Sequence, residues 1–95
     1  MAVKILIKRS APADKAAKLI PLLQRLRNLA MNQPGYISGE TLQRIGSTGE
    51  YTVISTWQSV ENWQQWATSL TRIELQNQID TVLNEKTEYE IYQYS

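Results

Sequence analysis

The sequence contains no histidine, no cysteine and no phenylalanine. Without cysteine, the chain has no disulfide, no thiolate nucleophile and no sulfur ligand for a metal. Without histidine, it lacks the commonest general base, the commonest metal ligand and the usual proximal ligand of haem. No cluster of oxygen ligands indicates a metal site either. We therefore expect neither a metal nor a cofactor.

Long hydrophobic runs are also missing. No stretch approaches the roughly 18 apolar residues that a membrane span requires. The N-terminal segment, residues 1–10, has charges inside its short apolar run and no small-residue cleavage site, so we do not interpret it as a secretion signal. With 95 residues, the chain is long enough for one domain, residues 1–95. We expect a cytoplasmic protein.

Charge is unevenly distributed along the chain: residues 1–27 carry seven basic side chains and one acidic one, whereas residues 45–95 carry two basic and seven acidic ones. The basic residues are spread over a strand-like and a helix-like segment without aromatic residues between them, a pattern that does not favour nucleic-acid binding. If the first and last strands are neighbours, Lys4 and Lys8 can lie opposite Glu88 and Glu90 and form cross-strand pairs.

Hydrophobic periodicity predicts six or seven elements. Residues 2–9 alternate as a strand with Val3, Ile5 and Ile7 on one face, and helical spacing begins at Pro12 and continues to Ala30. Two strands follow, joined by a "GSTG" hairpin turn. Ser59 is a candidate N-cap for a second helix to about Leu70. The two hairpin strands are residues 36–45 and 50–57. Residues 71–86 are predicted as a third helix or a continuation of the second, and residues 87–94 as the final strand.

This βαββαβ order predicts an α+β, ferredoxin-like antiparallel sheet with the helices on one face. The other face cannot be purely polar. Leu6, Tyr92 and Tyr94 are expected there, together with either Ile54 or the set Tyr51, Val53 and Trp57. Because an exposed apolar sheet face is usually buried by a partner, we expect a homodimer packed through this face.

The segment "SVENWQQWATS", residues 59–69, contains two of the three tryptophans. Helical geometry places Trp63 in an apolar stripe with the other core residues of this helix, while Trp66 lies at the edge of the stripe next to Asn62. Two interpretations stay open. Trp66 packs at the rim of the sheet with its N–H satisfied, or it forms a pocket wall while Asn62 donates to a substrate oxygen.

The segments "QPGYISGETL", "VISTW" and "SVENWQQWATS" resemble the antibiotic biosynthesis monooxygenase (ABM) family, whose members form dimeric α+β barrels. The resemblance implies a pocket between sheet and helices in each protomer. In the haem-degrading branch a histidine follows the helix tryptophan, but that position is Gln76 here. In the cofactor-free, quinone-forming branch, Asn62 and Trp66 match the family's asparagine and tryptophan, whereas Arg72 replaces a tyrosine and Lys86 an arginine.

The resemblance therefore implies a cofactor-independent monooxygenase acting on a small aromatic or quinol-type metabolite. Asn62 and Trp66 are the expected catalytic residues, and Arg72, Lys86 and Tyr51 are the expected substrate-binding residues. A non-catalytic dimer of the same fold that binds a small ligand or acts as an accessory protein is the alternative.

Overall fold

The computed structural model describes residues 1–95, which form four strands and three helices. The elements follow in the order β1 (Val3–Ser10), α1 (Ala16–Met31), β2 (Tyr36–Gln43), β3 (Glu50–Trp57), α2 (Val60–Ala67), α3 (Leu70–Leu83) and β4 (Tyr89–Gln93). The second helical region is thus two helices, each with its own serine N-cap. The side chains of Ser59 and Ser69 accept hydrogen bonds from the backbone N–H groups of Asn62 and Arg72.

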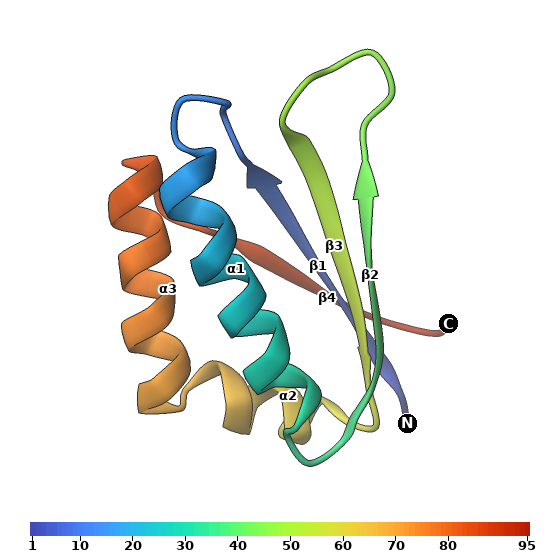
Figure 1. Cartoon of the computed structure of the whole chain (residues 1–95). Helices are drawn as coiled ribbons and strands as arrows, with labels where there is room; N and C mark the ends of the chain where they lie inside the picture. Colours follow the sequence, from blue (N-terminus) through green and yellow to red (C-terminus); the bar gives the residue numbers. More distant parts are fainter.

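The strands form one antiparallel sheet in the order β2-β3-β1-β4. All three helices lie on one face of this sheet, and the two termini lie near the same end of the molecule (Figure 1). This arrangement confirms the predicted ferredoxin-like fold. None of the helices is long and apolar enough to cross a membrane.

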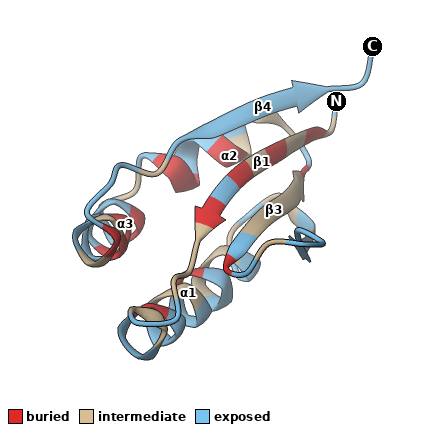
Figure 2. Ribbon diagram, turned by 90° about the horizontal axis from the view of Figure 1, so that it is seen from above, coloured by how far each residue is buried: buried red, intermediate tan, exposed pale blue.

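The core lies between β1, β3 and the helices. Val3, Ile5 and Ile7 of β1 are buried while the residues between them are more exposed, an alternation visible along β1 in Figure 2. On the neighbouring strand Trp57 is fully buried, and Trp63 from α2 packs on it with their ring centroids 5.6 Å apart. Burial of these large aromatic and branched side chains is the main stabilising term of a domain this small.

Turn chemistry positions α2 and the β2–β3 hairpin. Gly46 and Gly49 both adopt positive φ in the predicted hairpin turn. Gly35, with φ of 84°, precedes β2, and a Cβ at this position would lie 2.3 Å from Cγ of Asn62. Glycine is therefore needed at position 35 both for the backbone conformation and for the close approach of α2.

The start of α1 differs from the expected one, and the helix contains a proline. Residues 13–15 form a turn, so the helix begins at Ala16 rather than at Pro12, and it continues through Pro21. The missing N–H of Pro21 costs one helical hydrogen bond, and burial of Leu19 and Leu26 on the inner side of α1 offsets that loss.

The predicted pairing of Lys4 with a glutamate of β4 is wrong, and no lysine–glutamate salt bridge joins β1 and β4. Lys4 lies opposite Tyr92 and Leu6 lies opposite Glu90, because the register is shifted relative to the expected one. Lys4 instead donates a hydrogen bond to Oγ1 of Thr56, 3.0 Å away. The single salt bridge of the chain is elsewhere, at the hairpin tip, where Arg44 and Glu50 are 2.9 Å apart.

The register also decides which residues of β3 face away from the helices. Ile54 lies opposite Leu6 on β1 and opposite Glu40 on β2, so these three residues share the uncovered face. Leu42 and Tyr92 add apolar surface to it and are each 49% exposed. Of the two sets considered from the sequence, Ile54 is therefore the one on this face. We call it the open face.

Candidate functional site

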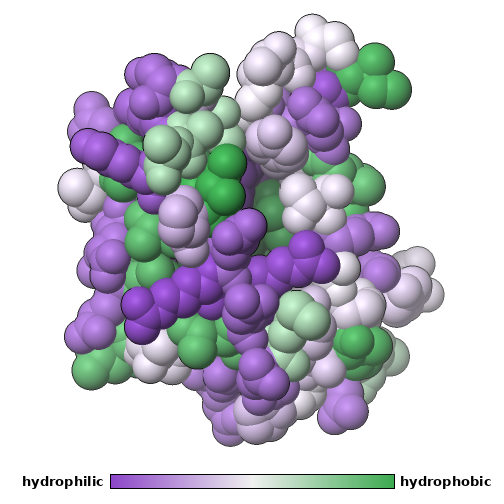
Figure 3. Space-filling view, viewed as in Figure 1, coloured by the Kyte–Doolittle hydropathy of each residue, from purple (hydrophilic) through white to green (hydrophobic).

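A cavity of about 330 Å³ lies between α1 and the helix-facing side of the sheet. Residues from α1, β1, β2, β3, α2 and α3 line it, and most of them are hydrophobic. Figure 3 shows the molecule hollowed between its helical side and the β2–β3 hairpin. A mostly apolar cavity of this size with a few polar groups is typical of a small-molecule binding site.

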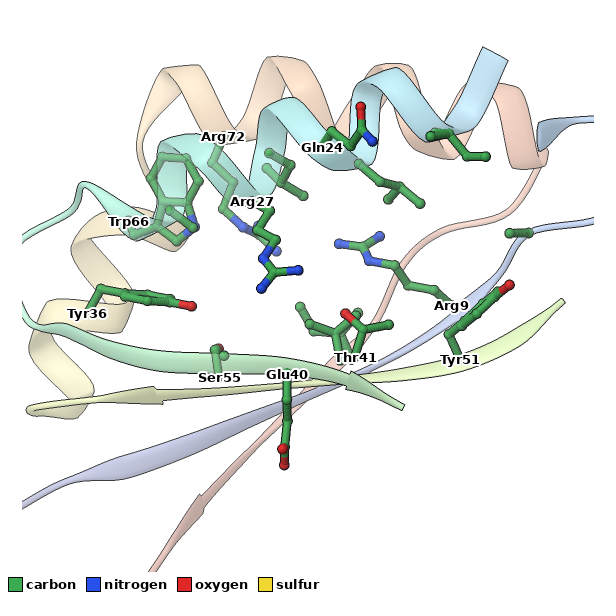
Figure 4. Close-up of a pocket in the computed structure, with 18 of the residues that line it drawn as sticks. Arg9, Gln24, Arg27, Tyr36, Glu40, Thr41, Tyr51, Ser55, Trp66 and Arg72 are labelled. Carbon is green, nitrogen blue, oxygen red and sulfur yellow. The ribbon is translucent and has the colours of Figure 1, made fainter. Parts of the chain in front are cut away.

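One end of the cavity is aromatic. Trp66 lines it and is only 3% exposed, and its indole nitrogen turns toward the interior (Figure 4). Tyr36 lies below it, with its ring edge-on to Trp57 at 5.4 Å between centroids. These rings provide a flat apolar surface on which an aromatic ligand can pack.

A β-bulge and a glycine hold Tyr36 in this position. The pairing of β2 with β3 is irregular between Tyr36 and Ser38, which sets Tyr36 opposite Trp57 on the helix-facing side. The Tyr36 hydroxyl passes over Gly39, where an added Cβ would be 2.4 Å from that oxygen. Gly39 thus leaves the space that the phenol occupies.

Arg72, at the start of α3, brings a buried cation to the same end. It is 6% exposed, and its guanidinium carbon lies 5.2 Å from the ring centroid of Trp63 and 5.7 Å from that of Tyr89. Burial lowers the pKa of Arg72, while Tyr89 and Asp80 partly oppose that shift. The groups nearest to the Arg72 charge are therefore the aromatic rings of Trp63 and Tyr89 and not a paired carboxylate.

Arg9, at the end of β1, brings a second buried cation from the opposite side. It is 8% exposed; its Nη2 donates to Oε1 of Gln76 at 3.4 Å, and its Nη1 is buried without any hydrogen-bond partner. Burial, and then repulsion from Arg72, lower its pKa to about 10, although Asp80 acts in the other direction. The carboxylate of Asp80 already accepts hydrogen bonds from Gln76 and Thr87.

A third arginine completes an electropositive interior. Arg27, an exposed residue of α1, extends over the cavity, so that Arg9, Arg27 and Arg72 direct their guanidinium groups toward one space (Figure 4). The one carboxylate among the lining residues, Glu40, points away from the cavity to the open face. The cavity therefore offers positive charge without a counter-ion from the protein.

Three of the five predicted site residues meet at this cavity. Trp66, Arg72 and Tyr51 line it, from α2, α3 and β3. The wall position of Trp66 follows from its place at the edge of the helical stripe, although Trp66 is buried as fully as Trp63.

The other two predicted residues lie outside the cavity lining. The side chain of Asn62 is held at the start of α2, where its Oδ1 accepts a hydrogen bond from the Ser59 hydroxyl at 2.7 Å and its Cγ packs on Gly35. Lys86 is exposed in the segment between α3 and β4. Their roles in catalysis and substrate binding stay predictions.

Sequence reasoning missed Arg9 and Tyr36 as site residues. A signal for Arg9 was present, since it continues the alternation of Val3, Ile5 and Ile7 and so had to share their buried face. No comparable signal marked Tyr36, because a bulge that no periodicity predicts sets its direction.

The arrangement can hold a flat, apolar molecule that carries negative charge. Arginine on apolar walls stabilises an anion strongly where water is scarce. No carboxylate or other obvious general base lines the interior, because Glu40 is turned away. No group of three or more acidic side chains that could hold a metal ion is present.

The fold and cavity define a small α+β domain with a partly open cavity that can hold a small molecule. The sequence model of the family described as antibiotic biosynthesis monooxygenase matches residues 2–77. The chain belongs to this family.

Solved structures with the same fold include proteins from an archaeon and from bacteria. A conserved protein from Methanosarcina mazei Go1 is 19% identical, with a TM-score of 0.87 over 100% of this chain and 94% of that one. SnoaB from Streptomyces nogalater, a cofactor-independent oxygenase, is 12% identical, with a TM-score of 0.83 over 99% and 93% of the two chains. Rv0793 from Mycobacterium tuberculosis is 14% identical, with a TM-score of 0.83 over 100% and 96%. No curated protein matches the chain in sequence.

Proposed function

We propose that this protein is a cofactor-independent monooxygenase that oxidises a small aromatic or quinol-type metabolite. The observation that carries the proposal is the cavity itself, which combines the Trp66 and Tyr36 rings with the buried cation of Arg72. Membership of the monooxygenase family and likeness to a cofactor-independent oxygenase support it.

The proposed reaction inserts one oxygen atom of O₂ at a ring CH₂ of an anthrone-like substrate. Loss of a proton gives an enolate, which transfers an electron to O₂. The substrate radical and superoxide then combine to a peroxide anion, which takes a proton back from water to give a hydroperoxide. Loss of water from the hydroperoxide then leaves a ring carbonyl. The balance is R₂CH₂ + O₂ → R₂C=O + H₂O, with O₂ reduced by the electrons of the two C–H bonds.

The protein's part in this reaction is electrostatic. Trp66 and Tyr36 pack against the ring, and Arg72 stabilises the enolate oxygen, which lowers the barrier to its formation. The substrate proton passes to water at the mouth of the cavity, because no general base lines the interior. The substrate must therefore be acidic enough to ionise with modest assistance.

Oxygen uptake with a panel of anthrones and hydroquinones tests the proposal. The expected result is O₂ consumption above the uncatalysed rate, with a quinone as product. Trp66→Phe should lower the rate without unfolding the protein, whereas Gln65→Ala, on the exposed side of α2, should not. If no substrate is turned over above background, the enzyme proposal fails. Binding without turnover would instead identify the non-catalytic alternative, a ligand-binding or accessory protein.

The same assay decides the predicted role of Asn62. Asn62→Ala should lower turnover if the amide leaves the Ser59 hydroxyl to contact substrate. Because this side chain also holds the start of α2, thermal stability must be measured in parallel. A loss of stability with an unchanged rate per folded molecule would assign Asn62 to the scaffold.

We also propose that the protein is a homodimer paired through the open face. Leu6, Ile54 and Tyr92 on this face have no covering layer, and β4 is exposed along its whole length. Lys4 and Glu90 lie on the same face, so a two-fold pairing of the face with itself can bring unlike charges together. Sedimentation at micromolar concentration should give a dimer, and a monomer would contradict the proposal.

A further inference from the structure

From the arginines of the cavity, we propose that the ligand carries a carboxylate that binds at Arg9, remote from its oxidised ring. The inference rests on the proposed function only for the aromatic nature of the ligand. It assigns a separate site to Arg9, at the end of the cavity away from the Trp66 and Tyr36 rings (Figure 4).

Arg9 is a buried cation without a compensating acceptor. Only 8% of Arg9 is exposed, its Nη1 has no partner, and its only hydrogen bond to a protein side chain is the long one to Gln76. A buried guanidinium is normally paired with a carboxylate or hydrogen-bonded on all its nitrogens. The missing partner of Arg9 is an acceptor that the protein does not provide.

The surroundings of Arg9 add positive charge instead of neutralising it. Arg27 and Arg72 point into the same space, and the only carboxylate that acts on Arg9, Asp80, is already bonded to Gln76 and Thr87. Folding places these three cations together at a cost in self-repulsion. A bound anion removes that cost and gains charge-assisted hydrogen bonds.

A carboxylate fits better than a phosphate. Gln76 already occupies Nη2 of Arg9, so a single buried nitrogen lacks an acceptor, and the rest of the lining is mainly hydrophobic. A phosphate carries more charge and needs donors for three oxygens. A carboxylate on an aromatic ring needs fewer donors, and its ring can pack on the hydrophobic lining.

Calorimetric titration with three probes of one ring system tests the assignment: 2-naphthoate, 2-naphthamide and 2-naphthyl phosphate. Because a charge-assisted hydrogen bond is roughly twice as strong as a neutral one, naphthoate should bind at least about tenfold more tightly than naphthamide. Equal affinities for the acid and the amide would overturn the proposal. Tighter binding of the phosphate than of the carboxylate would overturn the assignment of the group.

Variants locate the site. Arg9→Met should lower naphthoate affinity by about tenfold and leave naphthamide affinity unchanged. Arg9→Lys, which keeps the charge in case the methionine variant does not fold, should retain part of the preference for the acid. Arg25→Met, on the exposed side of α1 and outside the cavity lining, is the matched control and should bind both probes normally. An Arg9 variant that weakens both probes equally would show a structural role only.

These measurements do not depend on catalysis. A protein that binds naphthoate through Arg9 but consumes no oxygen with any anthrone would retain the carboxylate site and lose the oxygenase proposal. A protein that oxidises neutral anthrones but binds naphthoate no better than naphthamide would do the reverse.

Discussion

The two faces of the sheet differ in what covers them, although the same strands build both. On the helix-facing side, Ile5, Trp57 and their neighbours are closed off from water by α1, α2 and α3. On the open face, Leu6 and Ile54 lie between Lys4, Glu40 and Glu90 with nothing above them. The helices cover the first face without filling all the space above it, so that a cavity remains beneath α1. The second face has no covering layer.

On the helix-facing side, some residues contribute mainly to the packing of the core and others mainly to the cavity. Trp63 and Trp66 both line the cavity, but only Trp63 also packs against the rings of Trp57 and Tyr89 and the guanidinium of Arg72. The cavity and its unpaired arginines are regions where the domain gives up packing and charge compensation. Such losses are expected at binding sites, where a ligand restores them.

The largest effect is expected from removing the packing of the covered face. Trp63→Ala should lower the free energy of unfolding by about 3–5 kcal/mol, because it leaves a large void between α2 and the sheet. Urea denaturation measures the change. Ile54→Ala on the open face, examined below the dimerisation concentration, should cost less, and an equal cost would remove the contrast between the faces.

The open face should respond to charge rather than to lost volume. Ile54→Arg should convert the proposed dimer to monomers in sedimentation experiments, because it replaces an apolar side chain of the open face with a long charged one that must lose water at the interface. Gln65→Arg, on the outer side of α2, is the control and should remain dimeric. If the Ile54 variant sediments like the wild type, the dimer uses another surface.

A smaller effect, of opposite sign, is expected at Arg9. Its pKa, lowered to about 10 chiefly by burial and then by Arg72, means that the charged form opposes folding. Arg9→Met should therefore raise the unliganded protein's free energy of unfolding by about 1–3 kcal/mol at neutral pH.

The stability difference between Arg9→Met and the wild type should also depend on pH. Below pH 10, Arg9 is charged in both the folded and unfolded states, and its burial cost is fully present. As the pH rises through about 10, the folded protein releases the proton first, so the advantage of the methionine variant should shrink. Other titratable groups lie near Arg9, namely Arg72, Arg27, Asp80 and Tyr51. The wild type and the variant must therefore be compared at each pH, so that the contributions of these groups cancel. A variant less stable than the wild type at neutral pH would contradict the uncompensated-charge argument.

The smallest effect is expected at the hairpin tip, away from both faces. The Ser47 hydroxyl and then Arg44 lower the pKa of Glu50, whose side chain is exposed. Any contribution of the Glu50 carboxylate to stability is therefore present at a pH above its ordinary pKa and is lost as the pH falls through the lowered pKa. Glu50→Gln should leave the thermal unfolding midpoint at neutral pH unchanged, and a clear decrease would show that the tip supports the sheet.

Most of the fold was predictable because its signals are local. Alternation identified β1, helical spacing identified α1, and the Gly46–Gly49 turn identified the hairpin. The two serines explain why the second helical region divides, but only Ser59 was recognised as an N-cap from the sequence. The start of α1 was placed too early, because Pro12 is as favourable in the turn that precedes a helix as in its first residue.

The site was predictable only in part. Trp66 and Arg72 were identified through resemblance and helical geometry, and both line the cavity. Asn62 matched the same family pattern, yet a local hydrogen bond to Ser59 and the close approach of Gly35 turn its side chain elsewhere. Pattern matching fixes the residue's place on the helix, whereas the choice of rotamer depends on its neighbours in space.

The sequence by itself determined the element order, the single four-stranded sheet, the membership of Trp63 in the core and the absence of histidine and cysteine chemistry. Each of these follows from composition or from contacts close along the chain. Only the tertiary structure decided that Ile54 faces outward, that Lys4 meets Thr56 rather than a glutamate, and that Arg9, Arg27 and Arg72 share one cavity. These depend on strand register and on the packing of distant elements, which one-dimensional periodicity does not encode.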